Sequence, residues 1–252
     1  MVNKYQNVKR RRHSPSGTGR IPNAIADSIG VQIVSGVLNP GDVLNGEIKT
    51  SDQLRVSRAA YREAVRILSA KGLVKAFRKI GTRVTPREDW HLLDPDVLRW
   101  IFEFEPDEDL LSNLFELRRI VEPEAAALAA NRHSPADLVA MREALEKMSK
   151  HGIGSRSGQM ADQAFHAALL RAAQNIFIAS LTAGVGAAVT WTTIYKRAHS
   201  RHLRDSVPDH QKVYEAVVRG DARAARRAMA GLVDLALRDT TEAVHHARKA
   251  RR

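Results

Sequence analysis

The stretch from Ser51 to Val84, SDQLRVSRAAYREAVRILSAKGLVKAFRKIGTRV, decides the fold of the first third of the chain. It contains, in order, the patterns of a short helix, a tight turn, a second helix with arginines on one face, and a small hairpin. A winged helix-turn-helix needs this order to place one helix in the major groove of DNA. The sequence therefore predicts a DNA-binding head, with the rest of the chain positioning or controlling it.

Capping and core patterns locate the two helices of this head. Thr50, with Gln53 three residues later, has the arrangement of a capping box and is expected to begin the first helix. Ser57 is expected to cap the second helix. In that helix four residues recur at helical spacing and should face the core, namely Tyr61, Ala64, Val65 and Leu68. The residues on other faces, which are available to DNA, are Arg58, Ala59, Arg62 and Arg66.

A wing should follow the second helix. Lys71-Gly72 is expected to end the helix, and short strands are expected over residues 74–78 and 82–84. Between them, Lys79 makes the tip basic and Gly81 permits a sharp bend. Another helix, over residues 21–35, is expected to precede the motif.

The charge of the chain supports a DNA-binding head independently of the motif. Residues 1–88 contain 17 Lys and Arg against 6 Asp and Glu, whereas residues 89–252 contain 23 against 22. The excess positive charge therefore belongs to the first third, as expected of a basic module joined to a neutral one. A solvated basic surface is the simpler alternative, but without residues 1–20 the head still has 11 basic against 6 acidic residues.

Composition limits the class of protein further. At 252 residues the chain can form two modest domains, each with its own core. The absence of Cys excludes disulfides, thiolate zinc sites and cysteine nucleophiles, and it fits the cytoplasm. No apolar run approaches the roughly 20 residues that span a bilayer, and the first residues lack the apolar core of a secretory signal.

The expected organisation is mainly α-helical. Residues 1–20 read as a disordered basic arm, 21–88 as the winged helix-turn-helix, and 89–105 as a linker with one short helix near 96–102. Residues 106–247 are expected to form an all-α bundle of about six helices, followed by a frayed basic tail at 248–252. The expected bundle helices cover residues 110–130, 134–150, 157–174, 176–197, 208–219 and 221–248.

The run VSRAAYREAVRILSAKGLV at residues 56–74, preceded by a helix and a Pro-Gly turn, resembles the winged-helix head of the GntR family of bacterial transcription regulators. The resemblance covers about residues 20–86 and implies that Gly81 is the wing-tip glycine, which lies against the minor groove or the DNA backbone. It also assigns four residues to the start of the recognition helix, namely Ser57, Arg58, Ala59 and Arg62.

The arginines of this helix suit different DNA contacts. Arg58 can bind guanine O6 and N7 bidentately, whereas Arg62 and Arg66 more naturally meet phosphates. Family members usually carry an acidic-arginine-acidic-leucine run at the start of the first motif helix, where this chain has EIKT at residues 47–50. Lys49 is therefore the candidate replacement for that arginine.

Three segments of the second half resemble the FCD effector domain of the FadR-type subfamily, over about residues 106–246. They are ELR followed by VEP at residues 116–123, DQAFH at 162–166, and the segment from 209 to 229 with its early histidine. In that subfamily one Asp and three His converge on a divalent metal ion. The resemblance assigns Asp162, His166 and His210 to this set, and Leu232 stands where the last histidine is expected.

The incomplete set still permits a cofactor. Two His and one carboxylate can hold one divalent ion such as zinc, with water or a ligand carboxylate completing the coordination. Asp162 and His166 are one helical turn apart and share a face. The alternative is that they are ordinary buried polar residues that bond to each other.

Four residues are candidates for binding an effector. Arg118 lies on a largely apolar helix face, where a buried arginine needs an anion: either a ligand carboxylate or a neighbouring acid such as Glu122. A purely structural salt bridge is the alternative. Trp191 and Tyr195 could stack on a small polyol, or they could be core aromatics. The connector WHLLDPDVLRW at residues 90–100 resembles that of sugar-acid regulators of the galactonate-repressor type, which implies an aldonic or 2-keto-3-deoxy sugar acid as effector.

These patterns predict a sequence-specific transcription regulator, expected to be a repressor, that binds double-stranded operator DNA as a homodimer and responds to a small carboxylate. No catalytic residues and no membrane contact are expected. Three alternatives stay open. The same kind of regulator could respond to another organic or fatty acid. The chain could be a metal-dependent hydrolase using Asp162, His166 and His210. It could also be an architectural DNA binder whose helical core has no pocket.

Overall fold

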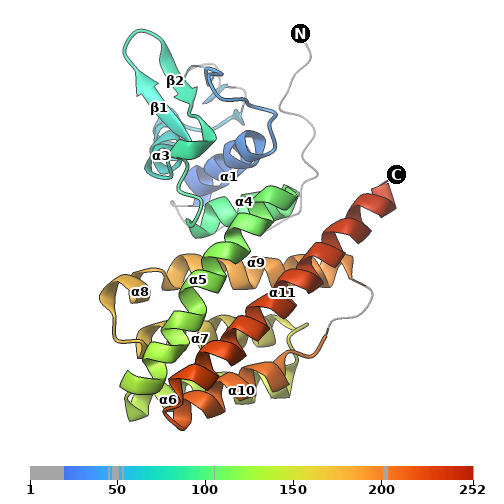
Figure 1. Cartoon of the computed structure of the whole chain (residues 1–252). Helices are drawn as coiled ribbons and strands as arrows, with labels where there is room; N and C mark the ends of the chain where they lie inside the picture. The colour runs from blue at the N-terminus through green and yellow to red at the C-terminus, as the bar shows by residue number, and fades with distance from the viewer. Residues whose placement is uncertain are drawn as a thin grey trace.

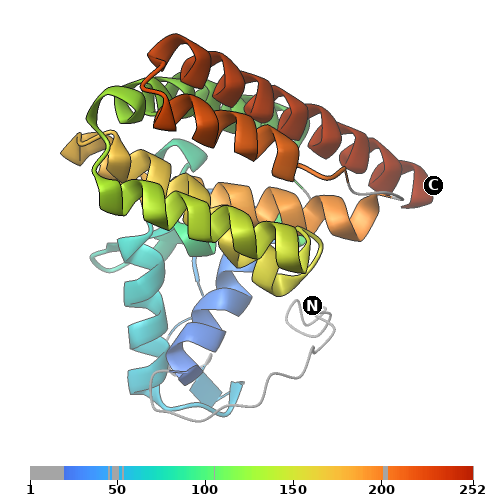
Figure 2. The same cartoon turned by 90° about the horizontal axis from the view of Figure 1, so that it is seen from below.

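A computed structural model describes residues 20–44, 46, 51–52, 54–104, 106–200 and 204–251. Residues 1–19 of the expected arm lie outside the described residues, as do Lys49, Thr50 and Gln53. The described chain is mainly helical, with a small head on one side of a larger helical bundle (Figure 1). The view from below separates the same two parts (Figure 2). The predicted fold class is confirmed.

The head is built on helices α1, Arg20–Val34, and α3, Arg58–Ala70. Residues 51, 52 and 54 are helical, and Arg55 then turns the chain with a φ of 54°. The hydroxyl of Ser57 accepts a hydrogen bond from the backbone N–H of Ala60 at 3.1 Å, as expected of an N-cap. The helices close over an apolar cluster that includes Ile25, Ile29, Ile33, Tyr61, Ala64 and Leu68.

The wing is an antiparallel hairpin of β1, Val74–Phe77, and β2, Gly81–Val84. Its strands are shifted slightly from the expected positions, because Arg78 lies in the turn and Gly81 begins the second strand. Lys79 and Gly81 have φ values of 65° and 103°. Both residues therefore have φ values in the left-handed region, which glycine adopts without strain.

Helix α4, Pro95–Phe104, lies between the head and the bundle and packs against both (Figure 1). It begins where the Asp94 carboxylate accepts hydrogen bonds from two backbone N–H groups of its first turn, at 2.9 and 3.3 Å. Val97, Trp100 and Ile101 belong to the apolar cluster of the head, and Leu98 and Phe102 to that of the bundle. The short helix expected in the linker is confirmed, and it is a shared part of both cores.

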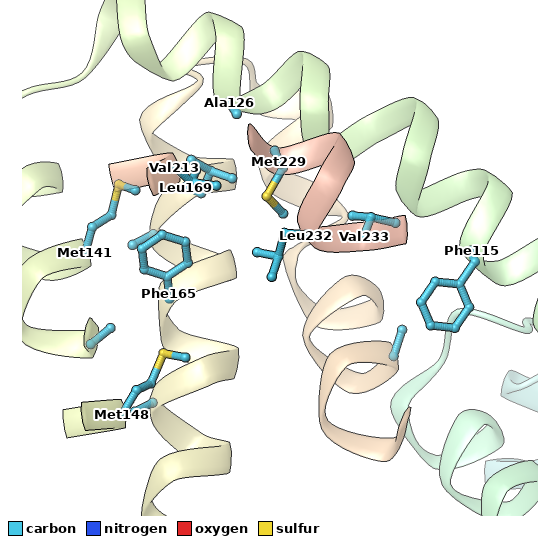
Figure 3. Packing of buried hydrophobic residues seen from close by; sticks show 14 of the residues in the cluster. Phe115, Ala126, Met141, Met148, Phe165, Leu169, Val213, Met229, Leu232 and Val233 are labelled. Atoms are coloured by element: carbon cyan, nitrogen blue, oxygen red, sulfur yellow. The ribbon is translucent and has the colours of Figure 1, made fainter. Parts of the chain in front are cut away.

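Seven helices of the described chain form the bundle (Figure 2). They are α5 (Glu108–Arg132), α6 (Pro135–His151), α7 (Arg156–Ala172), α8 (Ile176–Ser180), α9 (Thr182–His199), α10 (Val207–Val218) and α11 (Ala222–Arg251). Helices α5 and α11 make the most extensive contact in the bundle. Buried side chains of α5, α6, α7, α10 and α11 point toward one another in its core (Figure 3).

The single helix expected over residues 176–197 is a wrong prediction, because two helices, α8 and α9, occupy this region. At the break, the Ser180 hydroxyl donates to the Phe177 carbonyl and the Thr182 hydroxyl donates to the Ala179 carbonyl, each at 2.7 Å. Side-chain hydroxyls that bind nearby carbonyls compete with the helical pattern and favour such breaks.

The end of the chain also differs from expectation. Helix α11 continues to Arg251, whereas the residues after 247 were expected to be frayed. The Arg248 guanidinium pairs with the Glu108 carboxylate, which ties this last part of α11 to the start of α5. Among the described helices, none combines the length and the hydropathy of a membrane-spanning segment.

Candidate functional site

The residues predicted to contact DNA lie on the exposed surface of the head. Ser57, Arg58 and Ala59 stand at the start of α3, and Arg62 and Arg66 follow one and two turns later. All five are exposed, while the opposite side of α3 is buried in the head core. Residues spaced by four lie on one side of a helix, so the three guanidinium groups form a strip along α3.

The ion pair of Arg66 does not block its part of this strip. Arg66 pairs with Glu63 at 3.3 Å, but the two side chains are 78% and 50% exposed. A surface pair of this kind is weak and can be exchanged for a phosphate contact. Ser57 uses its hydroxyl oxygen as an acceptor for the helix, and its O–H hydrogen remains available to a phosphate.

The wing tip adds basic surface beside this helix. Lys79 and Gly81 are both exposed at the tip, as predicted. Arg55, in the turn before α3, and Arg78, in the wing turn, are exposed too and were missed as candidate contacts. The sequence places both arginines next to predicted turns, and this position could have identified them as exposed basic residues. Lys49 lies outside the described residues.

The predicted metal ligands meet in the interior of the bundle. Asp162 and His166 come from α7 and His210 comes from α10, and each is at most 3% exposed. His210 Nε2 lies 3.0 Å from Asp162 Oδ1 and 3.3 Å from His166 Nε2. His166 Nε2 lies 3.6 Å from Asp162 Oδ1. Two helices thus bring three ligand atoms to one point.

The other nitrogen of each imidazole fixes its orientation. His166 Nδ1 donates to a Glu122 carboxylate oxygen at 2.5 Å, and His210 Nδ1 donates to the Ser206 carbonyl at 2.8 Å. Both partners can only accept, so each Nδ1 carries the hydrogen. In neutral rings, both Nε2 lone pairs then face Asp162. This is the outer hydrogen-bonding pattern found around metal-binding histidines.

The three residues fit a divalent cation. Ligand atoms about 2.1 Å from a tetrahedral ion lie about 3.4 Å apart, and the observed separations are 3.0 to 3.6 Å. Asp162 Oδ1 is buried and has no hydrogen-bond partner among the described residues. Burial raises the pKa of Asp162, but the two histidines and Lys196 lower it overall, so the carboxylate is ionised.

Leu232 occupies the position expected of a further histidine. It is buried, borders the same cavity, and lies among the apolar side chains of the bundle core (Figure 3). Its side chain offers no ligand atom. A bound ion would therefore take its remaining coordination from water or from an oxygen of a small molecule.

Arg118 and Glu122 form a buried pair on α5. Arg118 Nε donates to Glu122 Oε1 at 2.6 Å, and the side chains are 3% and 0% exposed. Burial raises the pKa of Glu122, but Arg118 and His166 outweigh it and hold this pKa at about 2. The salt bridge that was the alternative to an effector contact is thus present, and Glu122 connects Arg118 to the histidine pair.

A small cavity of about 20 Å³ lies beside these groups. Arg118 lines it together with the three candidate metal ligands. Ile153 and Arg204 line both this cavity and a wider hollow on the surface, so they separate it from solvent.

The two predicted aromatic residues lie elsewhere. Trp191 is partly buried against the bundle core. Tyr195 meets Phe102 of α4 edge to face, with ring centroids 6.1 Å apart, and lies over His199 at 4.3 Å. Neither aromatic residue is part of the cavity wall. Helix α9 turns them away from the histidines.

Other residues of α9 face the cavity and were not predicted. They are Val189, Thr192, Thr193 and Lys196. Positions 189, 193 and 196 share one side of a helix. A lysine on the same side as these residues, in a largely apolar helix, was the signal that could have found this wall.

Comparison with known proteins places the chain among transcription regulators. Residues 22–84 match the family of bacterial regulatory proteins called the gntR family, and residues 113–235 match the FCD domain. The chain is 30% identical to the galactonate operon transcriptional repressor of Escherichia coli K12 over 207 residues, which cover 81% of the chain and 90% of the relative. It is 31% identical to the regulator LutR of Bacillus subtilis over 202 residues, which cover 78% and 90%.

A solved structure supports the fold alone. Lar, described as controlling expression of the Listeria monocytogenes agr system, aligns with a TM-score of 0.65 at 17% identity, over 91% of the chain and 99% of Lar. These relatives are transcription regulators rather than enzymes, in agreement with the exposed basic helix of the head. The chain belongs to the GntR family of bacterial transcription regulators and combines its DNA-binding head with the FCD domain of the FadR-type subfamily.

Proposed function

We propose that the chain is a repressor that binds operator DNA as a homodimer and releases it when a small sugar acid enters and widens the bundle cavity. One observation carries the proposal: an exposed basic helix and a buried cavity with Arg118 beside three metal-ligand groups occur in the same chain. A relative named as the galactonate operon repressor supports this effector class.

On the DNA, two recognition helices of a dimer would lie about 34 Å apart, in successive major grooves of a near-palindromic operator. Arg58, in the first turn of α3, would bind guanine, and its neighbour Ala59 leaves room for this approach. The groups that would bind phosphates or the adjacent groove are Lys49, Ser57, Arg62, Arg66, Lys79 and Gly81.

In the cavity, Asp162, His166 and His210 would hold one divalent ion such as zinc. When bound, the ion supplies a Lewis-acidic site for a carboxylate oxygen of the effector. The terminal nitrogens of Arg118 would bind the same carboxylate, because Nε already donates to Glu122. Glu122 would hold both Arg118 and His166 in place.

Helix α9 offers a route from the cavity to the head. It contributes Thr193 and Lys196 to the cavity wall, and it places Tyr195 against Phe102 of α4. Helix α4 in turn buries Trp100 in the head core. A ligand that shifts α9 would thus change how the head is held. By thermodynamic linkage, the ligand releases DNA only if it binds the DNA-free conformation more tightly than the DNA-bound conformation.

A gel-shift titration tests the proposal. Operator DNA bound to zinc-loaded protein should be released by galactonate or a related sugar acid. Arg118→Met, tested below its melting temperature because it loses a buried ion pair, should still bind DNA but no longer respond. Arg119→Met, which changes the next residue on the exposed side of α5, is the matched control and should respond normally. Intact DNA binding with no release by any sugar acid would exclude this effector class.

Another organic acid is the second candidate. Relatives of 29–31% identity include the Glc operon transcriptional activator of Escherichia coli and LutR, so the family members similar to this chain do not share one operon. Mass spectrometry of ligand that remains bound through purification would distinguish a sugar acid from a hydroxy or fatty acid.

A further inference from the structure

Lys196 is a buried cation with no local partner. It is 9% exposed, it lines the cavity from α9, and its ammonium group makes no hydrogen bond or ion pair within the described part of the chain. The two arginines that line the same cavity are both paired. Arg118 binds Glu122, and Arg204 binds Asp209 and Asp239. A buried charge without a partner is costly unless a ligand supplies one.

The surroundings of Lys196 favour an incoming anion. Burial lowers the pKa of Lys196, and repulsion from Arg118 and Arg204 lowers it further. Asp162 and Asp239 act in the opposite direction, but from beyond ion-pair distance. An anionic group beside the ammonium would stabilise its charged form and reduce the repulsion between the three cations.

The charges around the cavity favour a ligand with two negative charges. The positive charge of Arg118 is neutralised by Glu122. The negative charges of Asp209 and Asp239 are neutralised by Arg204 and Lys212. The remaining charges of the wall, one negative on Asp162 and one positive on Lys196, then sum to zero. A divalent ion at the three-ligand site adds two positive charges that no described residue neutralises.

A further polar group of the wall lacks a hydrogen-bond partner among the described residues. The Ser206 hydroxyl is buried, lines the cavity and makes no hydrogen bond with any described residue. Thr193 lines it from the same helix as Lys196. Hydroxyl groups next to an ammonium can donate to a carboxylate and complete its hydrogen bonding.

We propose that the effector is a diacid, whose first carboxylate binds Arg118 and the metal ion and whose second carboxylate binds Lys196. This inference rests on the proposed function and narrows its effector class from sugar monoacids to short sugar diacids. Lys196 is then the residue that determines specificity, since it distinguishes a terminal carboxylate from a terminal hydroxymethyl group.

Calorimetry with matched pairs of acids tests the inference. Zinc-loaded protein is titrated with galactarate and galactonate, which share six carbons, and with tartrate and threonate, which share four. The diacid of at least one pair should bind about 10- to 100-fold more tightly than its monoacid, the range expected of one added hydrogen bond to a charged group. Removal of zinc should reduce this preference, because the cavity then lacks the two additional positive charges.

Variants of the lysine separate recognition from folding. Lys196→Met should remove the preference for the diacid and leave the affinity for the monoacid unchanged, while Lys196→Arg should retain the preference. Arg197→Met alters the neighbouring exposed cation of α9 and should behave like the wild type. Thermal melting of each variant establishes that the fold is intact.

The outcomes distinguish the two proposals. If sugar monoacids release operator DNA and bind as tightly as the diacids in both pairs, the diacid inference is wrong and the proposed function stands. An unchanged diacid preference in Lys196→Met would also overturn the role of Lys196. If no mono- or diacid of this series binds or releases DNA, the sugar-acid effector itself is excluded.

Discussion

The head and the bundle use charge in opposite ways. In the head, Arg58, Arg62 and Arg66 are exposed on one side of a helix whose other side fills a small apolar core. In the bundle, Arg118, Glu122 and His166 form a chain of buried contacts between α5 and α7. Charges in water contribute little to stability, whereas buried charges are costly unless each is paired. Changes in the head should therefore affect binding, and changes in the bundle network should affect folding.

The largest expected effect tests the buried side of this comparison. Glu122→Gln leaves Arg118 and His166 without their carboxylate, and we expect the free energy of unfolding to fall by about 3–5 kcal/mol. Glu124→Gln is the matched control, because Glu124 lies on the same helix and pairs with Arg226, but on the exposed surface. Urea denaturation at neutral pH measures both. Equal losses would show that burial does not distinguish the two pairs.

A second change tests how tightly the head is held. A Cβ at Gly30 of α1 would lie 2.6 Å from the ring of Trp100, which is fully buried. Gly30→Ala should destabilise the protein by about 1–3 kcal/mol through overpacking. At Gly231 of α11 a Cβ meets no described atom within 4 Å, so Gly231→Ala should instead stabilise its helix by up to about 1 kcal/mol. Melting temperatures that shift in the same direction would contradict this contrast.

On the exposed side, Arg58→Ala should weaken binding to the preferred operator by about 1–3 kcal/mol and relax the base preference. Arg66→Ala should weaken binding to all sequences alike and reduce the salt dependence, since it removes a phosphate contact. Neither variant should change the unfolding curve. Binding isotherms at several salt concentrations measure both effects, and an equal loss of specificity in the two variants would refute the assigned contacts.

The smallest effect concerns the junction. Lys71 binds Asp94 at 2.7 Å and Asp96 at 2.9 Å, so Lys71→Met should cost about 1 kcal/mol of stability. Burial opposes both charges, but the pairing raises the pKa of Lys71 above 10.5 and lowers the pKa of Asp96 below 3.8. The contribution of Asp96 is present above 3.8 and is lost as the pH falls further, and that of Lys71 is lost only above 10.5. The free energy of unfolding, measured across pH, should differ between Lys71→Met and the wild type by a constant amount between pH 3.8 and 10.5. This difference should become smaller only below or above that range.

Local sequence patterns were sufficient to predict the helices of the head, but they were insufficient to predict the residues that line the cavity. The Ser57 cap and the spacing of Tyr61, Ala64 and Leu68 predict α3 correctly, because these signals act within one or two turns. The contact between Glu122 and His166 joins positions 44 residues apart, and only the packing of α5 on α7 creates it. The family resemblance supplied the three candidate ligands, but it did not reveal Lys196, which depends on the rotation of α9.

The same distinction explains the wrong prediction of a single helix over residues 176–197. Its apolar periodicity is continuous, yet the hydroxyls of Ser180 and Thr182 bind backbone carbonyls and divide it into α8 and α9. Helix α9 contributes Thr193 and Lys196, rather than Trp191 and Tyr195, to the cavity wall beside the histidines.

Helix α4 limits how such a protein can be recombined. A chimera that joins this head to the sensor of a relative has an obvious junction before Pro95, where the wing has ended. That junction would remove Val97, Trp100 and Ile101 from the core they complete, and would leave the head with an open apolar surface. A functional exchange would have to carry α4 with the head and rebuild the contacts of Leu98 and Phe102 on the new sensor.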